Sequence, residues 1–401
     1  MLAVLRNRDF GLLWVSGLVS VAGDWILYAA LPFYVYERTG STIATAGMIV
    51  AELAPAVLLG SAAGVFVDRW DRKHVLVGAN LLQAAAVSLL LLVPLDGWLW
   101  IVYAVAVAQS AVAAFAQPAE SALLPTLVAE ERLLAANALN ALNNRLARLV
   151  GLPLGAALLG LVGLRGVVAV DCLSFVLAAF LVAPIASRRV PRERPAGDAG
   201  SAWSAFWAEW RDGLRLVGRE RMVALLFVVL GLMTFGGTML DPLTVAWVRD
   251  VLGEGPEVFA WLLTAHAASG IAATLAVVRL GALISPRALI GWSSIAVAAA
   301  LALRHNVPSV TLALGLTAIA GVTSVVSSVG VETLAQRAVP DEYRGRVFGS
   351  LGATLGLLSL LGASVGGTVA EAVGIVPMLN VATALIALSG VVVLRSFPRG
   401  G

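Results

Sequence analysis

Long apolar runs alternate with short polar connections along the whole chain. A helix that crosses a bilayer needs about 20 consecutive apolar residues, so each run of this length predicts one spanning helix. Strands of a membrane barrel would instead alternate polar and apolar residues over segments of about ten. We therefore predict an all-α membrane protein with twelve spanning helices. The predicted spans are 10–36, 43–66, 74–94, 98–118, 136–162, 166–186, 222–248, 257–279, 287–304, 307–329, 347–370 and 373–394.

The amino-acid composition supports this prediction. The chain is 60% hydrophobic, whereas soluble domains contain about 45–50% apolar residues. Its single cysteine, Cys172, provides neither an intrachain disulfide nor a thiolate metal cluster. The net charge of +3 does not indicate a nucleic-acid partner, because basic residues in a membrane protein report its orientation. We expect the lipid bilayer as the surroundings and no nucleic acid.

The basic residues predict which ends face the cytoplasm. With the N-terminus inside, only four of the 27 Lys and Arg residues fall on the outer side: Arg38, Arg165, Arg249 and Arg304. Cytoplasmic loops of membrane proteins carry an excess of basic residues. The pattern therefore predicts a multi-pass membrane protein with two cytoplasmic termini.

The composition changes between the sixth and seventh predicted spans. Residues 188–201 are rich in Arg, Pro and Gly, which is typical of a flexible charged linker. Trp203, Trp207 and Trp210 then recur at helical spacing, which indicates an amphipathic helix in the headgroup layer or, alternatively, a helix that docks a partner. The predicted parts are a bundle over 1–186, a cytoplasmic linker with the interfacial helix over 187–220, and a bundle over 221–401.

The two halves of the chain also repeat each other. Three glycines of the first half recur 211 residues later without a gap, and an acidic loop after Val128 matches one after Val339 at the same offset. The glycine pairs are Gly151 with Gly362, Gly155 with Gly366, and Gly163 with Gly374. A period of half the chain predicts two six-helix bundles related by an axis along the membrane normal.

A charged turn lies between the second and third predicted spans. It contains Gly64, Asp68, Arg69, Arg72 and Lys73 at the spacing Gly-x-x-x-Asp-Arg-x-x-Arg-Lys. Charges are costly at the centre of a bilayer, so this turn belongs at the lipid boundary. The spacing resembles the signature loop between the second and third helices of the major facilitator superfamily. An ordinary positively charged cytoplasmic turn is the alternative interpretation.

Other stretches, among them 20–32, 118–125 and 334–346, are similar to the drug:proton antiporter branch of that superfamily, which includes macrolide-efflux and enterobactin-exporter proteins. The fifth helix departs from this branch, because Gly151-Leu-Pro-Leu-Gly155 stands where the antiporter motif has Gly-Pro-x-x-Gly-Gly. The fourth helix also lacks the membrane-embedded arginine of the better-known drug antiporters. These departures weaken the inference of proton antiport more than the inference of fold.

The resemblance implies the major facilitator fold, with two pseudo-symmetric six-helix bundles. It implies a secondary active transporter that exports lipophilic or amphipathic small molecules, such as macrolide drugs, by proton antiport with alternating access. A siderophore or lysolipid carrier of the same fold is the alternative. The expected partners are protons and an amphipathic substrate, the expected state is a monomer, and no cofactor is expected.

Nothing in the sequence indicates an enzyme. His74, His266 and His305 lie on separate elements without metal-ligand spacing, and no metal site is predicted. We find neither a nucleophile paired with a base nor a phosphate-binding loop for ATP. An ion gradient, or the substrate itself, would therefore supply the energy for transport.

Carboxylates inside the predicted spans are candidates for proton coupling, because an ionised acid is costly in hydrocarbon and is usually functional or paired. Asp24 and Glu52 lie at similar depths on the first and second spans, where each either carries a proton or makes only a local hydrogen bond. Asp241 precedes Pro242 on the seventh span and is either a proton site or a solvated acid at a hinge. Asp171, near the outer end of the sixth span, is interpreted as structural.

Polar residues form a stripe on the fifth span: Asn137, Asn140, Asn144 and Arg148. The stripe is either a cytoplasmic gate or a set of helix-to-helix hydrogen bonds. Arg148 either reaches the headgroups or pairs with Glu120 or with the acidic loop at Glu130 and Glu131.

The superfamily resemblance also implies a central cavity lined by the first, fourth, seventh and tenth helices. An aromatic cavity with one or two acids suits hydrophobic, often cationic drugs. Packing within the helices is the alternative role for each candidate. The candidate substrate residues are Trp25, Tyr28, Gln109, Phe115, Phe235 and Thr238.

The resemblance finally gives the charged turn a role as a conformational latch. It implies that Asp68 faces the start of the eleventh helix near Arg346, where the positive end of the helix would stabilise the carboxylate. Arg72 would hold Asp68 in place, and Gly64 would permit close helix approach. The corresponding turn over 279–287 has no acid, so the predicted latch is single.

Overall fold

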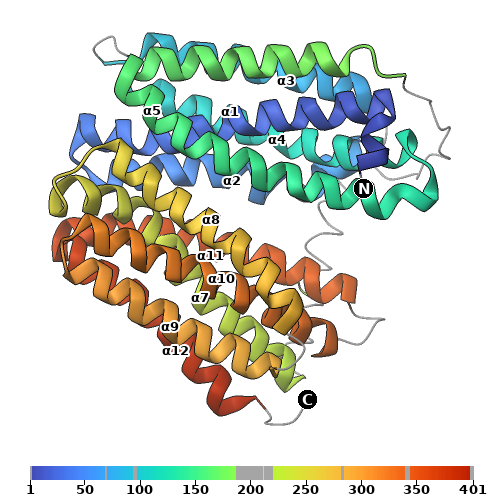
Figure 1. Ribbon diagram of the computed structural model, residues 1–401. Coiled ribbons are helices and arrows are strands. Elements are labelled where there is room, and N and C mark those ends of the chain that lie inside the picture. The colour runs from blue at the N-terminus through green and yellow to red at the C-terminus, as the bar shows by residue number, and fades with distance from the viewer. Residues whose placement is uncertain are drawn as a thin grey trace. The chain divides into compact units, whose positions relative to one another are not determined.

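The computed structural model of the chain is helical throughout the part that it describes, which comprises residues 2–67, 70–93, 97–186, 211, 220–280, 284–338 and 344–397 (Figure 1). Ten of the described helical stretches are long and apolar enough to cross a membrane. Large apolar side chains also point outward, such as Leu161, 83% exposed, and Phe180, 76% exposed. Exposing such side chains to water costs free energy, whereas exposing them to lipid does not. The chain is therefore a multi-span membrane protein.

Packing divides the chain into two compact units, which are described separately. The first unit contains residues 1–34 and 51–204. Its helices are η1 (Leu2–Arg6), α1 (Arg8–Thr39, as far as residue 34), α2 (Thr42–Val67, from residue 51), α3 (Arg72–Ser88), η2 (Leu89–Leu92), α4 (Trp100–Leu127), η3 (Glu130–Arg132) and α5 (Leu133–Val182).

The core of the first unit joins η1, α1, α3, α4 and α5. Fully buried Phe10 and Leu123 belong to one apolar cluster with Leu76, Leu139 and Ile185, which come from three further segments. α5 contains two helices that meet at Gly163, where φ is 66° and ψ is −173°. A positive φ is readily adopted only by glycine, and this turn falls between the predicted spans 136–162 and 166–186.

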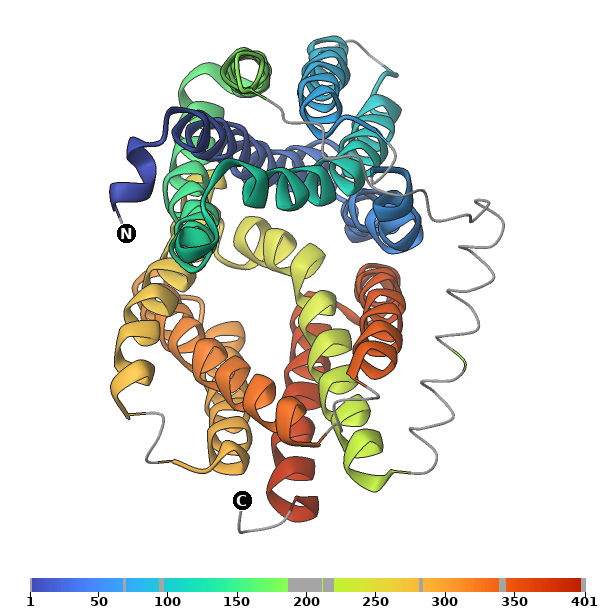
Figure 2. The same ribbon diagram turned by 90° about the vertical axis from the view of Figure 1, so that its right-hand side faces the viewer.

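The second unit contains residues 35–50 and 205–401. Its helices are α7 (Arg221–Ala246), the π-helical turn η4 (Trp247–Val251), α8 (Pro256–Leu280), α9 (Pro286–Asn306), α10 (Val310–Ala338), α11 (Arg344–Val373) and α12 (Ile375–Ser396). α10 packs against α8 and α9, and α7 packs against α11 and α12. Figure 2 shows the red α12 beside the yellow-green α7.

Residues 35–50 pack with this second unit, which the predicted boundaries did not anticipate. Glu37 pairs with Arg249 of η4 at 3.6 Å, and the adjacent Tyr36 hydroxyl donates to Asp250. The Thr42 hydroxyl donates to the carbonyl oxygen of Gly367 on α11 at 2.7 Å. An ion pair and two hydrogen bonds thus fix this short segment to η4 and α11.

The predicted spans match the described helices within a few residues at most ends. The main differences are α4, which continues through Pro118 to Leu127, and α10, which continues to Ala338. The linker and interfacial helix predicted over 187–220 lie outside the described residues, apart from positions 211 and 220. The twelve-helix count and the two pseudo-symmetric bundles remain predictions.

Candidate functional site

Two glycines bring α1 and α5 into close contact in the first unit. A Cβ atom added at Gly151 would lie 2.6 Å from the carbonyl oxygen of Ala22 and 2.6 Å from the Cβ atom of Trp25. One turn further on, a methyl group at Gly155 would overlap the backbone of Ile26. This approach holds the middle of α1 firmly against the helix that carries the polar stripe.

A buried acid lies against the same part of α1. Asp171, on the second half of α5, is completely buried, and a methyl group at Gly23 would overlap its Oδ1 atom and the hydroxyl of Ser174. The Ser174 hydroxyl donates to Asp171 Oδ1 at 3.3 Å. The Oδ2 atom of Asp171 has no hydrogen-bond partner among the described residues. Gly23 therefore makes room for a carboxyl group that is only half satisfied.

Asp24 follows directly after this contact and interacts electrostatically with Asp171 and with Glu52 of α2. The Asp24 side chain is exposed, whereas Asp171 is not. Carboxylates that lie close together in a medium of low dielectric repel one another, and protonation of one of them relieves the repulsion. We call Asp24, Glu52 and Asp171 the acid cluster, and its role in proton coupling remains a prediction.

The sequence predicted Asp24 and Glu52 as members of such a site and interpreted Asp171 as structural. The sequence did contain a sign that Asp171 belongs to a polar site. Asp171 and Ser174 are spaced three residues apart on an otherwise apolar helix, so their side chains lie on the same face. The third predicted proton site, Asp241, belongs to the second unit, where its side chain is exposed and Pro242 is buried. A proton role for Asp241 remains a prediction.

Aromatic side chains of α1 lie next to the acid cluster. The rings of Trp25 and Tyr28 meet edge to face, with centroids 5.1 Å apart. The guanidinium carbon of Arg148 lies 4.7 Å from the centroid of the Trp25 ring, and its buried Nε has no partner among the described residues. Arg148 thus makes a cation–π contact, and its predicted contact with headgroups or with an acid remains a prediction.

The other stripe residues serve helix packing to different degrees. Asn140 makes a side-chain hydrogen bond with Glu120 of α4, while Asn137 and Asn144 are exposed. Asn143, which the prediction omitted, is buried and donates from Nδ2 to the carbonyl oxygen of Trp14 at 2.6 Å. Hydrogen bonding between helices accounts for Asn140 and Asn143, and the gate remains a prediction.

Of the four remaining substrate candidates, Gln109 has unpartnered polar atoms, whereas Phe115 and Thr238 make packing contacts. Both polar side-chain atoms of Gln109 are buried without a partner in the described chain, an arrangement that normally requires water or a ligand. Phe115 instead stacks on Trp70, with ring centroids 6.3 Å apart. The hydroxyl of Thr238 donates to the carbonyl oxygen of Thr234 at 3.0 Å and faces Gly362. These contacts favour packing for Phe115 and Thr238.

Phe235 lies in the same contact between helices. A Cβ atom added at Gly362 would lie 2.6 Å from the Phe235 carbonyl oxygen. This contact involves the Phe235 backbone, so a substrate role for its ring remains a prediction.

A family profile described as "transmembrane secretion effector" matches residues 1–399 of the chain. The chain belongs to this family of major facilitator superfamily transporters. The family members and structural relatives are transporters and not enzymes.

Macrolide efflux protein A of Streptococcus pyogenes is 31% identical over 223 residues, which cover 55% of this chain and 54% of that protein. The chain therefore spans about half the length of this curated relative. The uncharacterized MFS-type transporter YfiS of Bacillus subtilis is 23% identical over 95% of this chain and 91% of its own. Among solved structures, a bacterial homologue of the iron transporter ferroportin in an inward-facing state superposes with a TM-score of 0.77, at 19% identity, over 97% of this chain and 98% of that one.

The signature turn of this transporter family is described only in part. Asp68 and Arg69 lie outside the described residues, and Gly64 lies in α2. Arg72 donates from Nη1 to the carbonyl oxygen of Ala122 at 2.9 Å, which ties the start of α3 to α4. The predicted clamp between Arg72 and Asp68, and the latch as a whole, remain predictions.

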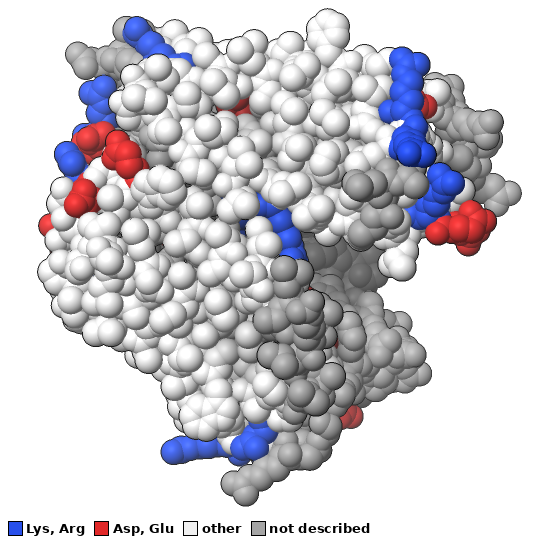
Figure 3. Space-filling view, viewed as in Figure 1, with Lys and Arg blue, Asp and Glu red and all other residues white. Residues whose placement is uncertain are grey.

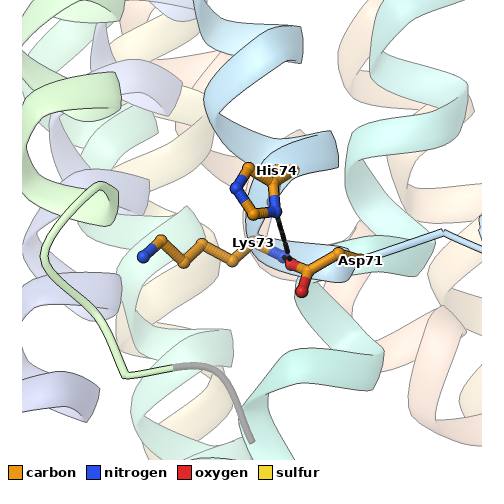
Figure 4. A network of polar contacts seen from close by, with 3 residues as sticks. All are labelled: Asp71, Lys73 and His74. Carbon is orange, nitrogen blue, oxygen red and sulfur yellow. Dashed lines mark hydrogen bonds and ion pairs between the residues drawn. The ribbon is translucent and has the colours of Figure 1, made fainter. Parts of the chain in front are cut away.

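Asp71, which the latch prediction omitted, is the N-cap of α3. Its Oδ1 atom accepts hydrogen bonds from the backbone nitrogens of Lys73 at 3.0 Å and His74 at 3.2 Å, and the His74 ring faces it at 3.2 Å (Figure 4). Partial burial acts to raise the pKa of Asp71, but the hydrogen bonds and the charge of His74 outweigh it and lower the pKa below its ordinary value. Figure 4 shows the Lys73 side chain pointing away from this carboxylate.

Proposed function

We propose that this transporter exports lipophilic or amphipathic small molecules, such as macrolides, in exchange for protons. The observation that carries the proposal is the contact between Gly23 and Asp171, which places a fully buried, half-satisfied carboxyl group beside Asp24. A buried carboxylate without a positive partner is costly. When Asp24 is ionised, the buried environment of Asp171 therefore favours the neutral form of the Asp171 carboxyl group.

In the proposed cycle the two acids have different tasks. Asp24 is the member with an exposed side chain and exchanges protons with the aqueous path, while Asp171 is the buried member that competes with it for a proton. A cationic or polar group of the substrate that approaches Asp24 would favour its ionised form and release the proton. Competition between substrate and proton at one acid is sufficient for antiport when combined with alternating access.

The proposed substrate class rests on two supports. One is the similarity to macrolide efflux protein A, which covers about half of each chain. The other is the chemistry of the first unit, where Trp25 and Tyr28 offer aromatic surface close to Asp24 on α1, and Gln109 of α4 offers an unpartnered amide. Aromatic surface with a few polar groups suits an amphipathic molecule. We further propose the bacterial inner membrane as the location, with both termini cytoplasmic.

Drug susceptibility of cells that lack other pumps tests the substrate class. We expect expression of the chain to raise resistance to macrolides, and the Asp24→Asn variant to lose that effect. Glu131→Asn, which removes an exposed acid of η3, is the matched control and should retain it. Absence of any shift across macrolides, dyes and quaternary cations would contradict drug export and favour a siderophore or lipid substrate.

A further inference from the structure

A basic hollow lies at one end of the second unit, where α7 and α9 begin and α12 ends. Its volume is about 720 Å³, and its lining residues are Arg221, Met222, Arg287, Leu394, Arg395, Ser396 and Phe397. Figure 3 shows basic side chains at the end of the molecule where α12 finishes in Figure 1. Three helix ends that are distant in sequence therefore bring three arginines to one pocket.

The positive charge of this pocket is not balanced within the described chain. Arg287 donates from Nη2 to the carbonyl oxygen of Leu394, and its buried Nε has no partner among the described residues. Arg221 and Arg395 are exposed, and no described carboxylate pairs with any of the three arginines. Glu220, the nearest acid in sequence, is exposed and is not part of the lining. The pocket is thus able to accept a negatively charged group.

Helix geometry adds to this preference for an anion. α7 begins at Arg221, and α9 begins at Pro286 with Ser285 as its N-cap. The N-terminus of a helix carries partial positive charge and unsatisfied N–H groups, which favour phosphate and other anions. The α7 end has no side-chain cap, whereas the α9 end offers only partial charge, because Pro286 has no N–H and the Ser285 hydroxyl already accepts from Ala288. The α7 end, combined with arginines that hold phosphate in a planar fork, matches a phosphate group.

Apart from Ser396, the remaining lining of the pocket is apolar. Phe397 is 4% exposed and belongs to a buried cluster with Val229, Ile290 and Val393, against which Met222 packs. Leu394 completes the apolar side of the lining. A ligand that fills this pocket therefore needs a charged group at one end and an apolar body at the other.

We propose that the pocket formed by Arg221, Arg287 and Arg395 binds the phosphate group of an anionic phospholipid. All three arginines lie at helix ends that the charge pattern assigns to the cytoplasmic side, where the headgroups of the inner leaflet are found. A water-soluble phosphate compound has the same charged group but makes no use of the apolar lining. The proposal concerns the second unit and does not depend on the transported substrate.

Native mass spectrometry of the full chain in detergent tests the proposal directly. Phosphatidylglycerol is titrated onto the protein, alongside diacylglycerol, which lacks the phosphate, and glycerol phosphate, which lacks the acyl chains. We expect one saturable phosphatidylglycerol site. The triple variant Arg221→Gln, Arg287→Gln, Arg395→Gln should bind roughly 100-fold more weakly, and Arg221→Gln and Arg395→Gln alone about fivefold more weakly each.

The matched control removes three arginines from the first unit, namely Arg6→Gln, Arg8→Gln and Arg132→Gln, which are exposed at helix ends. Unchanged binding in this control supports a specific site. Equal losses in both triple variants, or unchanged binding in the pocket variant, would overturn the site. Diacylglycerol binding as tight as that of phosphatidylglycerol would overturn the role of the phosphate, and equally tight binding of glycerol phosphate would overturn the lipid as its source.

Discussion

The two units use the same backbone contacts but carry different chemistry. In the first unit Gly151 packs on the carbonyl oxygen of Ala22, and in the second Gly362 packs on that of Phe235, with an added Cβ atom 2.6 Å away in both. The turns at Gly163 and Gly374 have positive φ angles of 66° and 94°. These pairs share the offset of 211 residues found in the sequence, so the repeat preserves helix packing.

The side chains that face equivalent glycines in the two units differ sharply. Gly23 faces Asp171 and Ser174, whereas Gly236 faces Ala382 and Leu385, which stand 211 residues further along. The position after each glycine is Asp24 in the first unit and Gly237 in the second. A polar, titratable contact in one unit is therefore an apolar contact in the other. The two units therefore share the backbone contacts, whereas the titratable side chains at this contact belong to the first unit alone.

The largest effect is expected when the first unit is given the residues of the second. The double change Asp171→Ala and Ser174→Leu should lower proton-driven uptake of a macrolide into inverted proteoliposomes by about 100-fold, a typical loss for a proton-transfer group. The folded protein should persist, because Ala382 and Leu385 occupy the equivalent contact in the second unit. Cys172→Ala, on the same helix, is the control and should leave transport unchanged. Full activity in the double variant would remove Asp171 from the cycle.

The glycine contacts should give equal effects in the two units. Gly155→Ala and Gly366→Ala each press a methyl group against a backbone, on Ile26 and Met239 respectively. Overpacking of this kind costs about 1–3 kcal/mol, measured as a fall in the apparent melting temperature in detergent. Gly349→Ala, where an added Cβ atom meets nothing, is the control. A fall in melting temperature for only one of the two glycine variants would show that the two contacts are not structurally equivalent.

A smaller effect is expected for the cation–π contact, which only the first unit has at this position. Arg148→Gln removes the guanidinium from the Trp25 ring and should lower stability by about 1 kcal/mol. Its counterpart at the offset of 211 is Ser359, whose hydroxyl bonds only its own helix at Leu355, so Ser359→Ala should have almost no effect. Equal melting temperatures for Arg148→Gln and the unaltered protein would show that the contact contributes nothing.

The smallest difference concerns two helix caps. Asp71 caps α3 and Ser285 caps α9, and replacing either by Ala should cost about 1 kcal/mol at pH 7. The folded pKa of Asp71 is lowered, so its contribution is fully present above its ordinary pKa of 3.8 and is lost as the pH falls through the folded value. The Ser285 cap does not titrate. Melting temperatures between pH 7 and pH 3 should therefore converge for Asp71→Ala and the unaltered protein, and stay apart for Ser285→Ala.

Much of the fold could be predicted from the sequence, because each helix must be apolar over a bilayer's thickness and each sharp turn needs a residue such as Gly163. The acid cluster could be predicted only in part. Asp24 and Glu52 stand out as charges in apolar runs, but the importance of Asp171 depends on a contact with Gly23, 148 residues earlier in the chain. Asn143 escaped prediction for the same reason, since its partner is the backbone of Trp14.

The central claim is that substrate and proton compete at the acid cluster of the first unit. Proton release on substrate binding measures this directly, with the purified transporter in weakly buffered detergent, a pH-indicating dye and a macrolide added to saturation. We expect about one proton released per bound molecule by the unaltered protein, and none by the Asp24→Asn, Asp171→Asn double variant at equal macrolide occupancy. Undiminished proton release from the double variant would contradict it.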